Sequence, residues 1–410
     1  MIKLSKNRLY KNILSMGILQ LINYSSPIVI LIYLTKVLST ENYGFIALSI
    51  SITQYSVVLM DYGFGIYATK LVSMYFRDKN KINEILGSVL IIKFTIFLLI
   101  SLVLSMILLC FESKINSYIF FLSLIPIFFQ GLNVEWFFLG IEKMKVITIN
   151  VLIGRLLIVF LTLLFIKKNN QYIFFPLITG FGQLIIFSMY IIQIYKNGYW
   201  LKFPSKYIFN DLLKNSFTFF LSRLSVITYT NGGTIFLGYF GNTYQVGIFS
   251  ISEQIYKAIQ TIITPISQAL YPFLVKEKKI RIWLKFVAVS LFFSSLLCIL
   301  LFIFFPLIFR IFFEPKYLKS IELLNIFLIA IPLHILNVLM GYPLSAIYGK
   351  ESSTNKTVFF GVFIFLLSIF SLVISKNIST INLAIISVIV EFSVLGLRIV
   401  QFFNFKRKNL

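Results

Sequence analysis

Long apolar stretches separated by short polar loops dominate this chain of 410 residues. A helix needs about 20 mostly apolar residues to cross a bilayer, where it satisfies its own backbone polar groups. The pattern therefore predicts an all-α integral membrane protein with about twelve transmembrane helices. We expect these helices at residues 12–35, 43–67, 85–110, 117–140, 146–167, 172–195, 214–240, 245–273, 283–309, 320–346, 356–376 and 380–403.

The longest polar interruption lies near the midpoint of the chain, at residues 196–213. The halves on either side of it share a weak repeat, because a shift of about 201 residues aligns Tyr43 with Tyr244 and Tyr55 with Tyr256. Parallel repeats occur in transporters with a binding site between two halves, although chance similarity of Ser- and Ile-rich helices also explains the match. We predict an N-terminal lobe of six helices at residues 1–198, a cytoplasmic linker at residues 199–213 and a C-terminal lobe of six helices at residues 214–410.

Composition and charge agree with a membrane protein. The chain is 59% hydrophobic and only 12% charged, whereas a soluble domain is about 25% charged. The net charge of +23 comes from cations in the loops and not in one patch, which argues against nucleic-acid binding. Loops on the side of the N-terminus hold about three times as many lysines and arginines as the opposite loops. The positive-inside rule therefore predicts that both termini are cytoplasmic.

Several ionisable side chains fall inside the predicted helices, where they usually face a partner or a wet cavity. Lys257 lies near the middle of the bilayer, one helical turn after Glu253, so the two side chains can pair. We expect Lys257 and Arg223 to line a cationic cavity that receives an anionic substrate. The alternative is snorkelling or a structural ion pair, which we favour for Lys93, Glu135 and Arg398. The candidates for substrate binding are Lys257, Arg223, Arg155, Asn231, Gln54 and Asn23, and those for ion coupling are Glu253, Asp61, Glu391 and His334.

Helix-breaking residues occur at matching places in the two halves. Asn23–Pro27 is expected to interrupt the first helix and Thr230–Gly233 the seventh. Irregular backbone at membrane depth is tolerated where it lines a cavity or packs in protein, so paired breaks predict a site between helices one, two, seven and eight. His334, the single histidine, follows Pro332. Imidazole is a suitable proton carrier, but a plain hydrogen-bonding role is the commoner one.

Motifs for enzymatic chemistry are missing from the sequence. We find no Gly-rich phosphate loop of the Walker type and no His, Cys, Asp or Glu cluster with metal-ligand spacing. We therefore expect neither catalytic activity nor a metal or other cofactor, and coupling to H⁺ or Na⁺ is left open.

Three strings in the sequence are characteristic of one family. The first, within residues 128–172, has Trp136–Met144 as its core, and the second, residues 42–65, contains Asn42–Gly44 and Asp61–Gly65. The third covers residues 235–259, with Gln268–Pro272 shortly after it. Together they resemble polysaccharide repeat-unit flippases of the Wzx type, and the resemblance covers most of the chain and thins after about residue 280.

This resemblance implies the fold of the multidrug/oligosaccharidyl-lipid/polysaccharide exporter superfamily, with two six-helix lobes around a central cavity, as in MATE transporters. It implies transport of an undecaprenyl-diphosphate-linked oligosaccharide across a bacterial inner membrane, by alternating access, for surface polysaccharide such as O-antigen or capsule. The diphosphate would contact Lys257 and Arg223 while the lipid tail stays among membrane lipids. Implied protein partners are a polysaccharide polymerase and a chain-length regulator. The alternatives are an ion-coupled multidrug antiporter on the same scaffold, a peptidoglycan-precursor flippase and a membrane polysaccharide polymerase.

Overall fold

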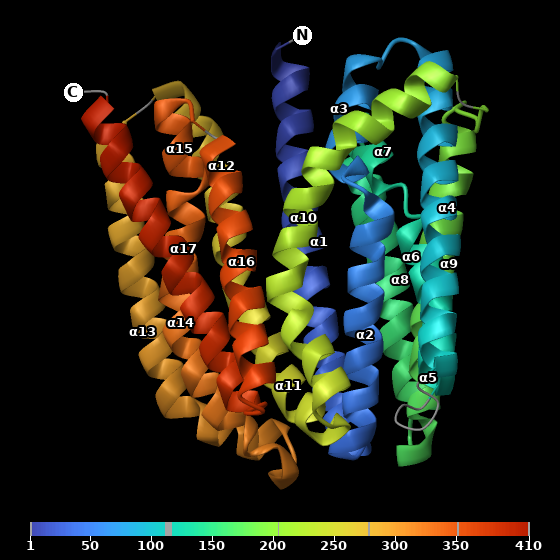
Figure 1. The fold of residues 1–410 in the computed structure, drawn as a ribbon. Helices are drawn as coiled ribbons and strands as arrows, with labels where there is room; N and C mark the ends of the chain where they lie inside the picture. The colour runs from blue at the N-terminus through green and yellow to red at the C-terminus, as the bar shows by residue number, and fades with distance from the viewer. Residues whose placement is uncertain (1, 111–116, 204, 278, 351, 409–410) are drawn as a thin grey trace. The chain divides into compact units, whose positions relative to one another are not determined.

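The computed structural model describes residues 2–110, 117–203, 205–277, 279–350 and 352–408, and the secondary structure assigned in these ranges is helical (Figure 1). The chain divides into two compact units, residues 1–224 and 225–410. The first unit contains α1 (Ile2–Val37), α2 (Thr40–Asp61), α3 (Phe64–Met74), α4 (Lys79–Cys110), α5 (Ser117–Leu122), α6 (Leu124–Gly131), α7 (Glu135–Gly140), α8 (Met144–Phe165), η1 (Asn169–Ile173), α9 (Phe174–Lys196) and the first part of α10 (Lys206–Phe240). The second unit contains the rest of α10, α11 (Thr243–Gln260), α12 (Ile263–Glu277), α13 (Ile280–Phe312), η2 (Pro315–Tyr317), α14 (Ser320–Met340), α15 (Tyr342–Tyr348), α16 (Ser352–Ile374) and α17 (Thr380–Lys408).

The predicted all-α membrane architecture is confirmed. Ten stretches within the described residues are long and apolar enough to cross a membrane. In α4 and α13, only 11% of the most apolar stretch is buried inside the protein, so most of their apolar surface is available to lipid. The expected helices at 214–240 and 245–273 are not among the ten. A total of about twelve helices stays a prediction.

Both units contain two broken helices at corresponding places. In the first unit α2 is separated from α3, and α6 from α7; in the second, α11 is separated from α12, and α14 from α15. The first halves of the broken helices pack together, α2 on α6 and α11 on α14. The second halves do the same, α3 on α7 and α12 on α15. The weak repeat in the sequence therefore extends to the way helices break and pack.

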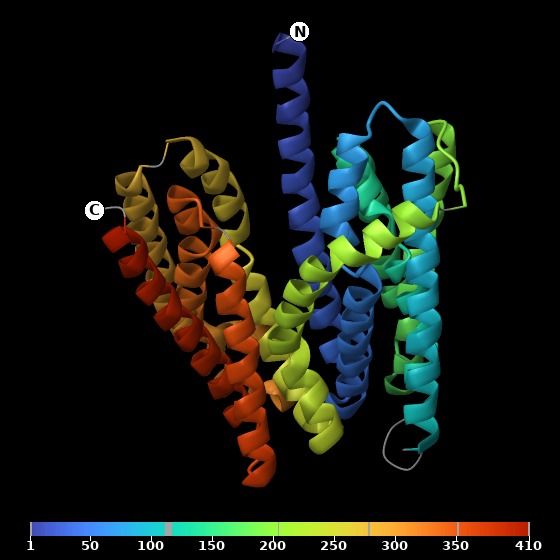
Figure 2. The same ribbon diagram turned by 45° about the horizontal axis from the view of Figure 1, so that its top comes forward.

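The breaks predicted at residues 23–27 and 230–233 are wrong, because α1 and α10 run through them without interruption (Figure 2). Pro27 removes only one donor from a long helix, which a membrane helix can tolerate. Gly232 and Gly233 serve packing, since a Cβ atom on them would lie 2.9 Å from the Phe365 ring and 3.1 Å from the Phe249 ring, respectively. The glycines admit two aromatic rings and leave the helix regular.

The first part of α10 packs on the first unit, although part of it was expected to form the linker at residues 199–213. The break at Gly63 makes this packing possible. Gly63 has a φ of +81°, and a Cβ atom there would lie 2.5 Å from the Ser216 carbonyl oxygen on α10. Beside it, the rings of Tyr62 and Phe220 stack with centroids 5.0 Å apart. The boundary between the compact units thus falls inside α10 and not before it.

The Trp136-Phe137-Phe138 core of the first family string lies on α7 and is buried, with each side chain at most 2% exposed. Gly140 lets α7 approach α3, because a Cβ atom there would lie 2.7 Å from Val72. These residues therefore form a packing contact between two half-helices.

Candidate functional site

Charged side chains gather at the break between α2 and α3 in the first unit. Asp61 ends α2, and its carboxylate accepts a hydrogen bond of 2.6 Å from Arg223 Nη1 on α10. Lys93 on α4 places its Nζ atom 4.0 Å from the other Asp61 oxygen and donates to the Asn133 carbonyl, 2.9 Å away. We call Asp61, Lys93 and Arg223 the Asp61 cluster. Two cations and one anion give it a net positive charge.

The two cations of the Asp61 cluster differ in exposure. Lys93 is 2% exposed and lies where α2 and α6 end, so it meets the negative ends of two helix dipoles and a carbonyl freed by a break. The Arg223 side chain is 47% exposed, so its guanidinium can reach another anion. This geometry fits a structural role for Lys93 and keeps Arg223 as a binding candidate.

Glu135 and Arg155 lie close to the Asp61 cluster. Glu135 begins α7 and Arg155 lies on α8, and both residues are half-buried. The Glu135 carboxylate interacts electrostatically with both Arg155 and Lys93. Arg155 therefore has an internal counter-charge and is a weaker binding candidate than Arg223.

A second cluster lies on α10 and α11 in the second unit. Lys257 Nζ is 2.9 Å from Glu253 Oε2 and donates to Asn231 Oδ1 at 2.6 Å. The same Glu253 oxygen accepts a hydrogen bond of 2.8 Å from Thr234. The side chain of Glu253 is 9% exposed, and that of Lys257 is 30% exposed. We call these four residues the Lys257 cluster.

A third cluster is built around Glu391 on α17. His334 Nδ1 on α14 lies 2.7 Å from Glu391 Oε1, and the Asn337 amide donates to Glu391 Oε2 at 2.6 Å. Arg398 donates instead to the Asn337 carbonyl and, over 3.0 Å, to Thr357 Oγ1. We call His334, Asn337, Glu391 and Arg398 the Glu391 cluster.

A small cavity joins the second and third clusters within the second unit. Glu253, Lys257, Gln260 and Glu391 line it together with Tyr229, Thr230, Tyr256, Phe327, Ser387 and Val390. About 20 Å³ is open to the centre of a water molecule, which is room for roughly one water and far too little for a sugar. Gln260 also donates a long hydrogen bond of 3.4 Å to Glu391.

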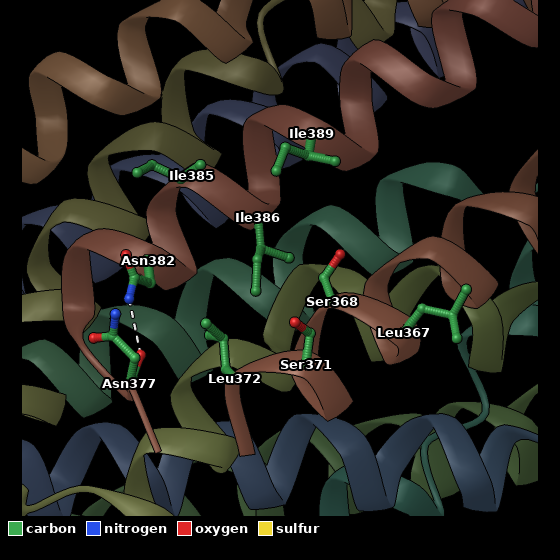
Figure 3. Close-up of a pocket in the computed structure, with 9 residues that line it drawn as sticks. All are labelled: Leu367, Ser368, Ser371, Leu372, Asn377, Asn382, Ile385, Ile386 and Ile389. Carbon is green, nitrogen blue, oxygen red and sulfur yellow. Dashed lines mark hydrogen bonds between the residues drawn. The ribbon is translucent and has the colours of Figure 1, made fainter. Parts of the chain in front are cut away.

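A larger cavity of about 490 Å³ lies between α16 and α17 (Figure 3). Its polar groups are Ser368 and Ser371 of α16, and Asn377 and Asn382, which share a hydrogen bond of 2.8 Å. The other lining side chains are Leu and Ile, and none of the residues that line it is charged. It lacks the cations expected around a phosphate group.

The structure groups most of the predicted residues but leaves two apart. Gln54 on α2 and Asn23 on α1 are half-buried, and no hydrogen bond among the described residues joins either to a cluster. Sequence reasoning missed Thr234, Gln260 and Asn337. Helical spacing could have found Gln260, seven residues after Glu253, and Asn337, three after His334, since such spacings share a face.

Comparisons with known proteins agree with this architecture. The model of a family described as "Polysaccharide biosynthesis protein" matches residues 9–278. A Shigella dysenteriae protein named "Putative O-antigen transporter" is 28% identical over 374 residues, which are 88% of this chain and 92% of that protein. An Escherichia coli (strain K12) protein of the same name is 27% identical over 272 residues, 65% of each chain. A solved multidrug resistance MATE family transporter of the MOP superfamily superposes with a TM-score of 0.77 over 97% of this chain and 98% of its own, at 14% identity. The predicted MATE-like exporter fold is confirmed.

Proposed function

This chain belongs to the polysaccharide biosynthesis protein family, and we propose that it moves lipid-linked oligosaccharide repeat units from the cytoplasmic to the outer leaflet. It is a multi-pass protein of the bacterial inner membrane with an exporter fold. The substrate that we propose is a lipid in which an oligosaccharide is joined through a diphosphate to a polyprenyl chain.

The observation that carries this proposal is that Lys257 is partly exposed and has a hydrogen-bond donor to spare. Its ammonium group donates to Asn231 and pairs with Glu253, which leaves one of its three N–H donors without a partner among the described residues. The side chain is 30% exposed although it lies in the part of the chain predicted to be at mid-membrane. A partly open cation at that depth suits a substrate whose charge is a diphosphate.

Arg223 supports the same chemistry in the first unit. Its guanidinium presents several donors in a plane, of which only Nη1 is engaged by Asp61 in the described structure. A phosphate group can therefore bind Arg223 without breaking that ion pair. α4 and α13 present apolar surface to lipid, so the polyprenyl tail of the substrate can stay in the bilayer beside the protein.

The test is complementation of a strain that lacks this chain, with the leaflet location of the lipid-linked precursor as the readout. Without the protein, precursor should accumulate on the cytoplasmic leaflet and surface polysaccharide should be lost. Wild type should restore both, and Lys257→Ala and Arg223→Ala should each reduce export at least about tenfold, because a charge-assisted hydrogen bond contributes about 1.5–3 kcal/mol.

The matched control is Lys202→Ala. Lys202 forms an ion pair of 3.1 Å with Glu84, but its side chain is 54% exposed and lies outside the three clusters. The Lys202→Ala variant should export polysaccharide normally when it is present at the wild-type protein level. Normal export by both Lys257→Ala and Arg223→Ala would remove the anion-site assignment. Unchanged polysaccharide with altered drug sensitivity would instead indicate a multidrug antiporter.

A further inference from the structure

Glu253 opposes the anion-binding role of Lys257. Its Oε2 atom lies 2.9 Å from the ammonium group and is also held by Thr234 at 2.8 Å. A phosphate that approaches Lys257 must compete with this carboxylate and is repelled by its charge. A proton on Glu253 would remove both obstacles, because a carboxylic acid has no charge to neutralise Lys257.

We propose that Glu253 is a proton-binding site, loaded through His334 and Glu391, and that its protonation frees Lys257 to bind the diphosphate. That the bound anion is a diphosphate rests on the proposed function, whereas the proton path rests on contacts within the second unit. The consequence is that each substrate binds together with one proton.

The path from Glu391 to Glu253 crosses the small cavity. Both carboxylates line it, and Gln260 lies beside Glu391. Its open volume of about 20 Å³ accommodates roughly one water molecule. Such a water would have the two carboxylates and nearby amide and hydroxyl groups as partners, which satisfies the requirement for a buried water.

His334 provides the entry to this path. Its side chain is 24% exposed, whereas that of Glu391 is 10% exposed, and their atoms are 2.7 Å apart. Asn337 holds the second oxygen of Glu391, so the carboxylate is oriented with one oxygen toward the imidazole. His334 is also the chain's single histidine, the side chain best suited to exchange protons near neutral pH.

Other titratable groups surround this path on each helix that packs against it. Tyr229 of α10 and Tyr256 of α11 interact electrostatically with Glu391, as does Arg398 of α17. Arg398 donates its hydrogen bonds to Asn337 and Thr357, so it offsets the Glu391 charge without occupying its oxygens. The groups that face Glu391 from these elements are Tyr229, Glu253, Tyr256, Lys257, His334 and Arg398.

Each step transfers one proton and no other atom. The protonated imidazole gives its Nδ1 proton to Glu391 Oε1, which becomes a carboxylic acid. Glu391 passes a proton to the water in the cavity as that water gives another to Glu253. The ion pair with Lys257 is then replaced by a neutral acid beside an ammonium group. Reversal of these steps returns the proton when the anion leaves.

Binding of farnesyl diphosphate to the purified full-length protein tests the linkage. For wild type, affinity should rise as pH falls, by up to about tenfold per pH unit, the limit for uptake of one proton. Glu253→Gln should lose the part of this pH dependence that proton uptake by Glu253 contributes and keep only the part that comes from titration of the diphosphate itself, because the amide is neutral at every pH. Thr234→Val should move the pH dependence to more alkaline values, because the carboxylate loses a stabilising hydrogen bond. An unchanged pH dependence in both variants would overturn the proposal.

The route is tested by the rate of proton uptake, followed with a pH-indicator dye after farnesyl diphosphate is added. His334→Asn, which retains a hydrogen-bond donor toward Glu391, should slow uptake at least about tenfold without changing the number of protons bound. Glu314→Gln is the control, because Glu314 is a half-exposed carboxylate in the same unit, and it should change neither quantity. An unchanged rate in His334→Asn would remove the entry assigned to His334.

Infrared titration of the ligand-free protein separates this proposal from the proposed function. Among the protonated carboxyl bands that depend on pH, one should be present in wild type and absent from Glu253→Gln. If that band is found but farnesyl diphosphate does not bind, the proton site stands and the flippase proposal fails. If farnesyl diphosphate binds but the band is the same in Glu253→Gln and wild type, the proton site fails and the flippase proposal stands.

Discussion

The buried cations Lys93 and Arg398 contact corresponding broken helices, α6 and α14, although they belong to helices that do not correspond, α4 and α17. Lys93 donates to the Asn133 carbonyl just after α6 ends, and Arg398 donates to the Asn337 carbonyl in the last turn of α14. Both are less than 10% exposed. A cation at a helix C-terminus interacts favourably with the helix dipole and with carbonyl groups near the helix end, so these residues serve the fold. Lys257 and Arg223 differ because part of each side chain remains exposed.

We predict that Lys93→Met lowers the free energy of unfolding by about 1–3 kcal/mol, the cost of leaving a buried acceptor unpaired. Thermal unfolding in detergent measures the effect. Lys202→Met is the control, because its ion pair with Glu84 is largely exposed and contributes little. Equal stability of the two variants would contradict a structural role for Lys93.

Close contacts between helices depend on small residues at specific positions. Gly154 on α8 and Gly182 on α9 form a reciprocal contact, since a Cβ atom on either would lie 3.2 Å from the carbonyl oxygen of the other. The same Cβ atoms would lie 2.3 Å from Ile186 and Ile158. Lipid gives two helices little hydrophobic reason to associate, so such close packing is what holds α8 against α9.

We expect Gly154→Val and Gly182→Val each to destabilise the protein by about 1–3 kcal/mol through overpacking. Gly396→Val should leave stability unchanged or slightly higher, because nothing lies within 4 Å of its added Cβ atom and valine favours helix more than glycine. Unfolding temperature in detergent distinguishes the three variants. A large loss in Gly396→Val, or none in the other two, would contradict the packing argument.

Charge distribution over the whole molecule gives its predicted orientation. Cations are about three times as frequent in the loops on the side of the N-terminus as in the opposite loops. We predict that fluorescent-protein fusions to either terminus fluoresce in the cytoplasm. Alkaline phosphatase inserted near Lys167 should be active, because that loop is predicted to face outward. If alkaline phosphatase fused to the C-terminus were active, the predicted orientation would be wrong.

Apolar periodicity and length determined much of this molecule before any coordinates. The apolar stretches locate the central part of each membrane helix, because backbone polar groups in lipid must be paired within the helix, whereas helix ends extend into charged segments, as at Ile2 and Lys408. Each expected helix overlaps an observed helix or a consecutive set of them. The pairing of Lys257 with Glu253 also followed from their spacing of four residues, which places both on one face.

Tertiary structure decided where helices break and which polar groups meet. Gly232 and Gly233 predict a break from the sequence but lie inside a helix, where Phe365 and Phe249 pack against them. The contact of His334 with Glu391 joins α14 to α17 across 57 residues of chain, so no local pattern could show it. The sequence determines which residues can enter a membrane helix, since the free-energy cost of placing a residue in lipid depends on its side chain. Their partners depend on how separate helices pack, and that is decided only in three dimensions.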